Sequence, residues 1–289
     1  MKESYDNILM SNFPMWLDNY ILRRGEAFHN VDSNFYGTSS KFNGFYAYSL
    51  PYSQMVYDSS VTGANVPTGV YVNGTFYGKG QGDFVDFSYD RGIAYFSANQ
   101  AGSSISGRFA VKDFNIILSS EPEEKILFET KYVRKPKVPQ IATGHANNEI
   151  AYPVIIVRNN GSYNKPLTFG GTDMTCVDVT AYIFADSQYK LDSATSLLRD
   201  SSNQYIPLLS RQEMPFNVFG GLKSGVFNYT GAVNGKVQTN EAAFIEQVSV
   251  SKFERNLYSQ TKILNPDVYF AIVDFSIEKV RNPRESVGV

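Results

Sequence analysis

The sequence has little of the chemistry on which most enzymes and metal proteins depend. It contains one Cys and two His in 289 residues, so disulfide frameworks, multi-cysteine zinc sites and most imidazole-based catalysis lack their raw material. The glycine-rich segments 78–82 and 102–107 resemble a phosphate loop and a nucleophile elbow only superficially, because each leads into a strand pattern. We therefore expect no enzyme, no catalytic residues, no metal site and no cofactor.

An excess of positive charge is also missing. Lys and Arg total 26 against 28 Asp and Glu, for a net charge of -2, so sequence-specific nucleic-acid binding is not expected. The longest apolar runs, 152–157 and 268–273, are far shorter than the roughly 20 residues of a membrane helix. The first 16 residues include Glu3 and Asp6 and no apolar stretch of signal-peptide length. These features predict a protein that is made in the cytosol and has no membrane partner.

Aromatic residues are abundant instead. The chain has 21 Phe and 20 Tyr, which with one Trp make up 15% of the residues, and 22 Gly. Aromatic side chains suit a pleated, half-buried surface, and Gly tolerates the positive φ angles of tight turns. The composition predicts a mainly β fold: an antiparallel β-sandwich or barrel built from hairpins, with an extended N-terminal arm and two short helices.

The first 65 residues are expected to form an N-terminal helix and the arm. Trp16, Leu17, Tyr20 and Ile21 recur at helical spacing, which predicts a helix over 13–28 that begins at Pro14. Residues 30–65 are rich in Ser, Asn, Gly and Tyr without sustained periodicity. This pattern predicts an extended arm or long loop whose tyrosines need a surface to pack on.

Residues 66–124 are expected to form a β-meander of three hairpins. In 70–77, Asn73-Gly74 lies between apolar flanks and supplies the two positive φ values of a type I′ turn. In 84–96, Gly92 is the expected left-handed residue of the turn. The third hairpin would pair 105–111 with 114–118.

Residues 125–289 are expected to form a β-sandwich domain with a short helical insertion, unless the chain is a single composite domain. The boundary is placed within 119–148, where acidic, basic and proline-rich segments follow one another. The helix is expected at 191–200, from the spacing of Leu191, Ala194 and Leu198, and 203–221 is expected to be irregular. Strands are expected at 126–133, 150–157, 175–185, 226–229, 243–253 and 268–280, with a turn between the second and third of these.

Two groups of polar or reactive residues have both a functional and a structural interpretation. Asp83, Asp86 and Asp90 could bind a hard cation, but Asp83 and Asp86 point to opposite faces of the predicted strand, which favours solvated hairpin acids. Cys176 lies on an apolar strand with no His nearby in sequence, which favours a small buried side chain over a nucleophile.

Two segments resemble structural proteins of tailed bacteriophages. Residues 85–118, VDFSYDRGIAYFSANQAGSSISGRFAVKDFNIIL, resemble a strand pattern of virion proteins from the neck region, and 182–200 together with 215–221 (PFNVFGG) also resemble phage structural proteins. The resemblance covers about a fifth of the chain and implies assembly, with no catalytic residues to carry over. It implies a virion protein, assembled in the host cytoplasm, that joins head and tail as a symmetric ring or connector.

The expected partners are copies of the chain itself and other head, neck or tail proteins. An aromatic arm too irregular to form its own core would expose apolar surface unless a neighbouring subunit covered it. The expected interface residues are Phe35, Tyr36, Phe42, Phe45, Tyr46, Tyr48, Pro215, Phe216 and Phe219. The alternative is a carbohydrate-binding tail-tip or fibre-associated module, which would instead carry exposed aromatic residues in a groove. A glycoside hydrolase is a third possibility and would need two facing carboxylates in a cleft.

Overall fold

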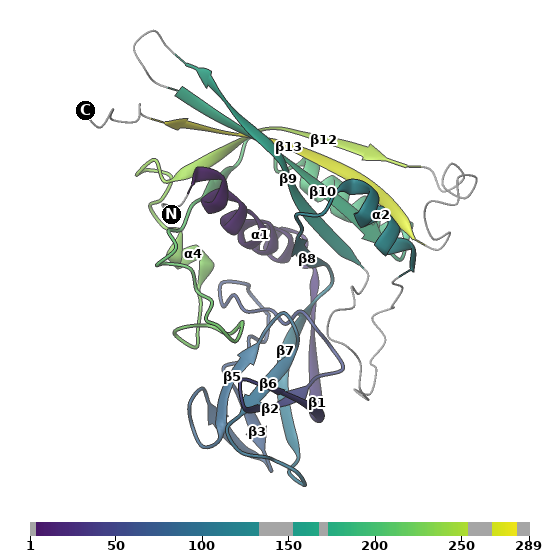
Figure 1. Ribbon diagram of the computed structural model, residues 1–289, viewed down its shortest axis with the longest axis vertical. Helices are drawn as coiled ribbons and strands as arrows, with labels where there is room; N and C mark the ends of the chain where they lie inside the picture. Colours follow the sequence, from purple (N-terminus) through teal and green to yellow (C-terminus); the bar gives the residue numbers. More distant parts are fainter. Residues whose placement is uncertain (1–3, 133–152, 168–172, 254–267, 282–289) are drawn as a thin grey trace.

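The computed structural model describes residues 4–132, 153–167, 173–253 and 268–281. The described part of the chain is mainly β, with 45% strand and 18% helix, and its strands form two largely antiparallel sheets. The predicted fold class is therefore confirmed. Figure 1 shows the two sheets at opposite ends of the molecule, with helix α1 (Tyr5–Arg24) lying between them.

The first sheet has seven strands in the order β4-β3-β7-β1-β2-β6-β5. The predicted hairpins β3–β4 and β5–β6 form, but they lie at opposite edges of the sheet. The prediction of a three-hairpin meander was therefore wrong. The strands are β1 (Phe28–Phe42), β2 (Phe45–Ser49), β3 (Gly69–Val72), β4 (Thr75–Gly78), β5 (Phe84–Ser88), β6 (Ile93–Phe96) and β7 (Ile105–Lys112).

The segment predicted as an extended arm supplies the middle of this sheet. β1 pairs with β7 on one side and β2 on the other, and Phe35 faces Ile105 across the β1–β7 pair. Sequence analysis missed this strand because β1 is rich in polar residues. Only one face of β1 packs on the core, while Asp32 and Asn34 face solvent. Strands from both sides of the expected boundary at residue 65 thus share one sheet.

The predicted turn residues have the expected backbone conformations. Asn73 and Gly74 have φ values of 50° and 84°, as a type I′ turn requires. Gly92 has a φ of 64°, and a Cβ atom added there would lie 2.0 Å from the carbonyl oxygen of Tyr52. Position 92 therefore requires glycine, both for its backbone conformation and because there is no room for a Cβ atom.

The second sheet has six strands in the order β11-β12-β13-β10-β9-β8. β8 was expected to pair with β7, but it pairs in parallel with β9, so the third hairpin does not form and the expected boundary at 124 divides strands of one sheet. β9 also continues through the turn expected after residue 157, with a bulge beside Asp178. The strands are β8 (Asn115–Leu118), β9 (Val154–Pro166), β10 (Asp173–Ala185), β11 (Tyr205–Pro207), β12 (Ala242–Lys252) and β13 (Tyr269–Arg281).

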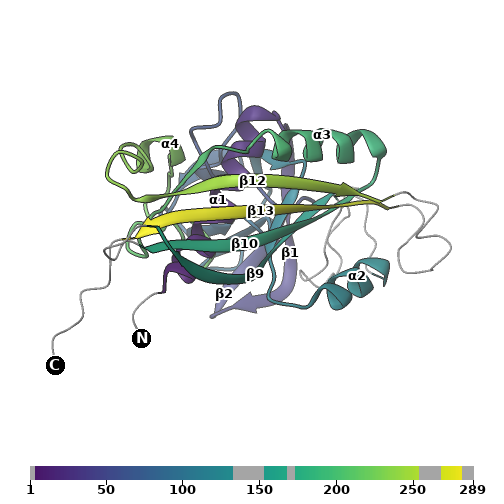
Figure 2. The ribbon, with the colours of Figure 1, turned by 90° about the horizontal axis from the view of Figure 1, so that it is seen from above.

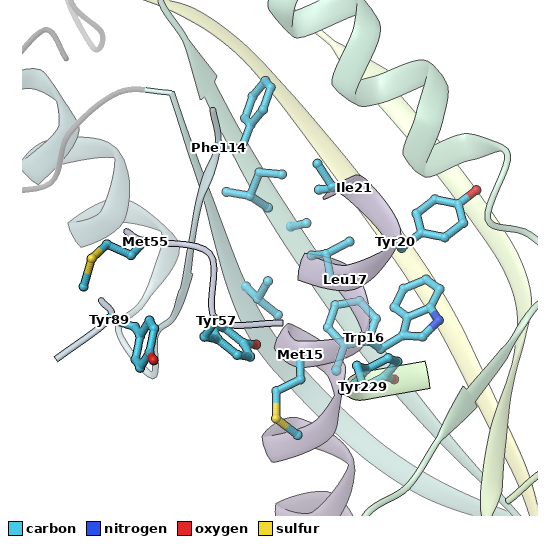
Figure 3. Packing of buried hydrophobic residues seen from close by; sticks show 14 of the residues in the cluster. Met15, Trp16, Leu17, Tyr20, Ile21, Met55, Tyr57, Tyr89, Phe114 and Tyr229 are labelled. Carbon is cyan, nitrogen blue, oxygen red and sulfur yellow. The ribbon is translucent and has the colours of Figure 1, made fainter. Parts of the chain in front are cut away.

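Helix α1 is longer and more buried than its sequence predicts. It begins after Ser4, whose hydroxyl accepts a hydrogen bond from the backbone N–H of Asn7, so Pro14 lies inside the helix and does not start it. Leu9, Phe13 and Leu17 are fully buried, and Figure 3 shows this helix packed among residues of both halves of the molecule. A helix surrounded by core on most sides has no single apolar stripe to reveal it.

The described residues contain three further helices. α2 (Glu123–Tyr132) occupies most of the segment predicted as a strand over 126–133, and its Ile126 packs on Tyr182 and Phe184 on the outer face of the second sheet. α3 (Gln188–Arg199) confirms the predicted helix and lies against β10, β12 and β13 (Figure 2). The predicted strand 226–229 is wrong, because α4 (Tyr229–Ala232) begins there after an Asn228 cap. The expected boundary segment 119–148 lies partly outside the described residues.

Candidate functional site

Two of the three acidic residues considered for cation binding, Asp83 and Asp86, have protein partners. Asp86 lies 2.8 Å from the Lys79 ammonium and accepts a hydrogen bond of 2.5 Å from the Asn217 amide. Asp83 accepts a hydrogen bond of 3.0 Å from the Gln100 side chain. Within the described ranges, no group of three or more His, Cys, Asp or Glu side chains is arranged to hold a metal. These carboxylates fasten turns and loops.

Cys176 is buried, as predicted. Its residue has no exposed surface, its Sγ donates a hydrogen bond of 3.4 Å to Glu278, and burial raises the pKa of its thiol. A raised pKa leaves little reactive thiolate at neutral pH. The geometry favours a packing role for this side chain.

The predicted interface residues pack largely on their own chain. Phe35, Tyr48 and Pro215 are buried, and most of the others are half-buried. Tyr36 alone in the set is exposed, at 39%. The premise that another subunit must cover an unsupported arm is therefore wrong, because β1 and β2 are part of a sheet with its own core.

Phe219 connects the two segments that were expected at subunit contacts, residues 30–65 and the loop around Pro215, within one chain. Its ring centroid lies 5.8 Å from that of Phe42, 5.4 Å from that of Phe45 and 5.6 Å from that of Tyr95. Phe216 makes a separate edge-to-face contact of 5.0 Å with Tyr57. Sequence analysis expected these aromatic residues at contacts between subunits, whereas within the chain the segment 215–222 packs on Phe42, Phe45 and Tyr95 of the first sheet.

A cleft of about 520 Å³ lies at one end of β1 and β2, beside the segment 99–103. Such a volume is within the range of small-molecule sites. Tyr36, Tyr46 and Thr38 line one side, and Asn99 and Gln100 line the other. The cleft thus combines aromatic rings with amide groups.

Hydrogen bonds from Tyr48 hold this cleft in shape. The Tyr48 hydroxyl donates to Asn99 Oδ1 at 3.0 Å and accepts from the backbone N–H of Gln100 at 2.7 Å. Lys41 Nζ lies 4.0 Å from the centroid of the Tyr46 ring, which leaves Tyr36 as the more accessible aromatic surface. Sequence analysis selected the tyrosines but not Asn99 and Gln100, because nothing in the local sequence links the 99–103 loop to β1.

A buried ion pair joins α1 to the first sheet. Lys112 Nζ of β7 lies 2.7 Å from Asp18 Oδ2 of α1, and both side chains are almost completely buried. The Lys112 ammonium also lies 4.6 Å from the centroid of the Tyr57 ring. Burial raises the pKa of Asp18, whereas the neighbouring Lys112 opposes that rise. This pair fixes the register of α1 against β7.

Asp58 supports the same junction. Its carboxylate accepts hydrogen bonds from the Asn19 side chain at 2.6 Å and from the backbone N–H groups of Ser60 and Tyr229, each at 2.9 Å. Asp58 is 2% exposed, and these donors compensate for the loss of water. The carboxylate therefore connects α1, the segment after β2 and the start of α4.

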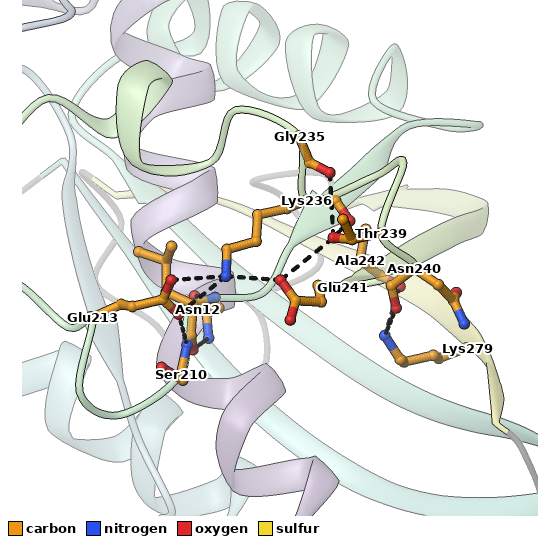
Figure 4. A network of polar contacts seen from close by, with 11 residues as sticks. Asn12, Ser210, Glu213, Gly235, Lys236, Thr239, Asn240, Glu241, Ala242 and Lys279 are labelled. Carbon is orange, nitrogen blue, oxygen red and sulfur yellow. Dashed lines mark hydrogen bonds and ion pairs between the residues drawn. The ribbon is translucent and has the colours of Figure 1, made fainter.

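A more exposed network fastens the segment between β11 and β12, as Figure 4 shows. The Lys236 ammonium lies 2.8 Å from Glu213 Oε1 and 2.8 Å from Glu241 Oε2. Glu213 also accepts a hydrogen bond from the backbone N–H of Ser210, and together these contacts lower its pKa to about 2. These three side chains close the loop between β11 and β12.

One end of the second sheet extends beyond the core with apolar side chains exposed. Tyr163 of β9 and Val280 of β13 are 54% and 40% exposed, and the strand register places both on the same face as Cys176. Leu167, just beyond β9, is 45% exposed. Figure 1 shows this end of β9, β10 and β13 projecting past α1. Three apolar side chains therefore remain exposed at this end of the sheet.

Comparison with known proteins does not assign the chain to a family. No protein-family model matches the sequence, and no curated protein matches it significantly. In the part of the chain that the structure describes, no helix is both long enough and apolar enough to cross a membrane.

Proposed function

We propose that this chain is a structural subunit of a tailed-phage virion and forms a symmetric ring in the neck or tail region. The observation that carries the proposal is the projecting end of the second sheet, where Tyr163, Leu167 and Val280 remain exposed. A neighbouring subunit that covered this surface would bury apolar area and satisfy exposed strand edges together. The resemblance of residues 85–118 to neck proteins supports the same function.

The ring can be tested with the full-length chain in solution. Light scattering coupled to size exclusion, native mass spectrometry and negative-stain electron microscopy should give one closed ring with a defined copy number. A chain that stays monomeric at every concentration tested contradicts the ring. Immunogold labelling of particles of the phage that encodes the chain tests its location, with label expected at the neck or tail and its absence from the particle contradicting a virion role.

The cleft beside β1 favours a second candidate, carbohydrate binding. Tyr36 offers an exposed ring for stacking on a sugar, and Asn99 and Gln100 place amide groups opposite. The packing of the predicted arm on its own chain removes one argument for the ring and leaves this cleft accessible in the single chain.

A glycan array followed by saturation-transfer NMR tests this second candidate. Tyr36→Ala should abolish binding, whereas Tyr71→Ala should not, since Tyr71 is also 39% exposed and lies outside the cleft. Absence of binding by the parent chain, or equal loss in both variants, contradicts a sugar site in the cleft.

A further inference from the structure

The second sheet has a free edge on β12. β11 pairs only with the start of β12, between Tyr205↔Phe244 and Pro207↔Ala242, and the last backbone contact on this side joins Asn203 to Ile245. From 247 to 252, none of the described residues pairs with the outer edge of β12. This six-residue stretch therefore presents backbone N–H and C=O groups that a further strand can bind.

A second free edge lies on β9, on the other side of the same sheet. β8 pairs with β9 only from Asn115↔Val154 to Leu118↔Val157, and Ser119 adds one hydrogen bond to the Val157 carbonyl. Residues 158–166 pair with β10, but among the described residues no strand lies on their other side. The two free edges thus occupy diagonally opposite corners of the sheet, as Figure 2 helps to show.

The direction and position of these edges are complementary. β9, β10, β13 and β12 alternate in direction, so β12 of one copy and β9 of a similarly oriented second copy would be antiparallel. Traced onto β10, the midpoints of the two free edges lie about four residues apart, or roughly 13 Å along the strand. Closed arrangements of tilted strands require such a stagger.

The β12 edge has the composition of a strand acceptor. Residues 247–251 read QVSVS, without a charge or a proline. Val248 and Val250 pack against the core, and Ser249 and Ser251 are exposed. Lys252, which could repel an incoming strand, is held 2.7 Å from Asp192 of α3.

We propose that the free edge of β12 in one copy pairs antiparallel with the free edge of β9 in the next, which continues the second sheet from subunit to subunit. This inference rests on the proposed ring and names its interface. The same contact brings a neighbour to Tyr163 and so covers part of the exposed end of the sheet. Because the two paired edges differ, the contact is head-to-tail, and repetition about an axis closes a ring.

Proline substitutions test the role of the β12 edge. Ser249→Pro and Val250→Pro are made separately, because successive N–H groups of a strand point to opposite sides. One variant removes a donor from the free edge and should fold as a monomer, whereas the other removes a donor from the pairing with β13 and should lose stability. Circular dichroism and thermal melting identify the variant that folds, and light scattering gives its mass.

Cysteine cross-linking tests the named partner without relying on a destabilised variant. In a Cys176→Ser background, Ser249→Cys with Tyr163→Cys should give a ladder of disulfide-linked oligomers, and Lys165→Cys in place of the latter samples a neighbouring register. These β12 and β9 positions are separated by β13 and β10 within one chain, so a cross-link reports contact between chains. Ser249→Cys with Tyr71→Cys is the control and should give no ladder.

The outcomes separate this inference from the function on which it rests. A parent ring, a folded monomeric proline variant and a β12–β9 ladder support the inference. A parent ring that survives both proline variants without a ladder overturns the inference and leaves the ring intact. A dimer that cross-links through Ser249→Cys alone reveals a two-fold β12–β12 contact and also overturns it. A monomeric parent chain overturns the ring itself.

Discussion

The two sheets differ in how completely the strands at their edges are paired or covered. In the first sheet, the edge strand β4 has four residues, and β5 lies under the 217–222 segment, where Tyr89 donates to the Gly220 carbonyl. In the second sheet, the edge strands β8 and β11 have four and three residues, and they pair with only part of their neighbours β9 and β12, which have 13 and 11 residues. Short or covered edges suit a sheet that only has to fold, whereas long open edges suit one that binds a further strand. This difference is why we propose that the second sheet carries the contact between copies.

Helix α1 keeps the two sheets in one structure. Its Leu17 and Ile21 belong to the main core with residues of the second sheet, and its Leu22 packs with Val56 and Ala110 on the side of the first. We therefore expect the two sheets to unfold together despite their different surfaces.

The largest effect is expected from Asp18→Asn, which tests this shared unfolding. The substitution leaves the Lys112 ammonium buried beside a neutral amide, and it should lower the free energy of unfolding by about 3–5 kcal/mol. Urea denaturation followed by far-UV and near-UV circular dichroism should show one transition. The double variant Asp18→Asn with Lys112→Met should recover most of the loss. Two separate transitions contradict a common unit, and a single-variant loss below about 1 kcal/mol contradicts a structural role for the pair.

The next effect is expected at the turns of the first sheet. Gly92→Val should lower the free energy of unfolding by more than the about 1–3 kcal/mol of backbone strain alone, because its Cβ would also meet the Tyr52 carbonyl. Gly74→Val is the matched control, since Gly74 also has positive φ but nothing lies within 4 Å of an added Cβ. Urea denaturation of both variants measures the difference. If both variants lose the same free energy of unfolding, the close approach of the Tyr52 carbonyl does not contribute to the effect.

A smaller effect is expected in the second sheet from Cys176→Ser. The hydroxyl can still donate to Glu278, so the loss should be about 1 kcal/mol, and assembly should be unchanged. In the parent chain, the thiol should react with a thiol reagent only on unfolding. Loss of assembly without loss of stability contradicts the packing role.

Sequence patterns predicted the elements that depend on local chemistry. The Asn73-Gly74 and Gly92 turns, helix α3 and the long strands β10, β12 and β13 have local signatures, and all are present. β1 and α2 were missed for tertiary reasons. β1 is polar on its solvent-facing side. The segment of α2 has a strand-like sequence, but Ile126 packs on aromatic rings of the second sheet from a helix.

The candidate sites were less predictable because they depend on pairing order. The cleft forms only because β1 lies near the 99–103 loop, and the free edges exist only because β8 and β11 are short partners of β9 and β12. Strand order is a long-range property that local periodicity does not encode. If residues 30–65 formed a separate arm, their deletion would leave the strands folded. Because β1 lies in the middle of the first sheet, we expect the deletion to unfold the chain.

The smallest effect is expected at Glu213, in the loop between β11 and β12. Contacts with Lys236 and Ser210 lower its pKa to about 2, so its ionised form stabilises the fold above the pKa of about 4.3 that it has when unfolded. That contribution is lost as the pH falls from about 4.3 toward 2. Because the side chain is 43% exposed, solvent screening limits the loss in Glu213→Gln to less than about 1 kcal/mol at pH 7. Thermal melting of parent and variant should show the difference at pH 7 and its disappearance toward pH 2. A difference that grows on acidification contradicts the ion pair as its source.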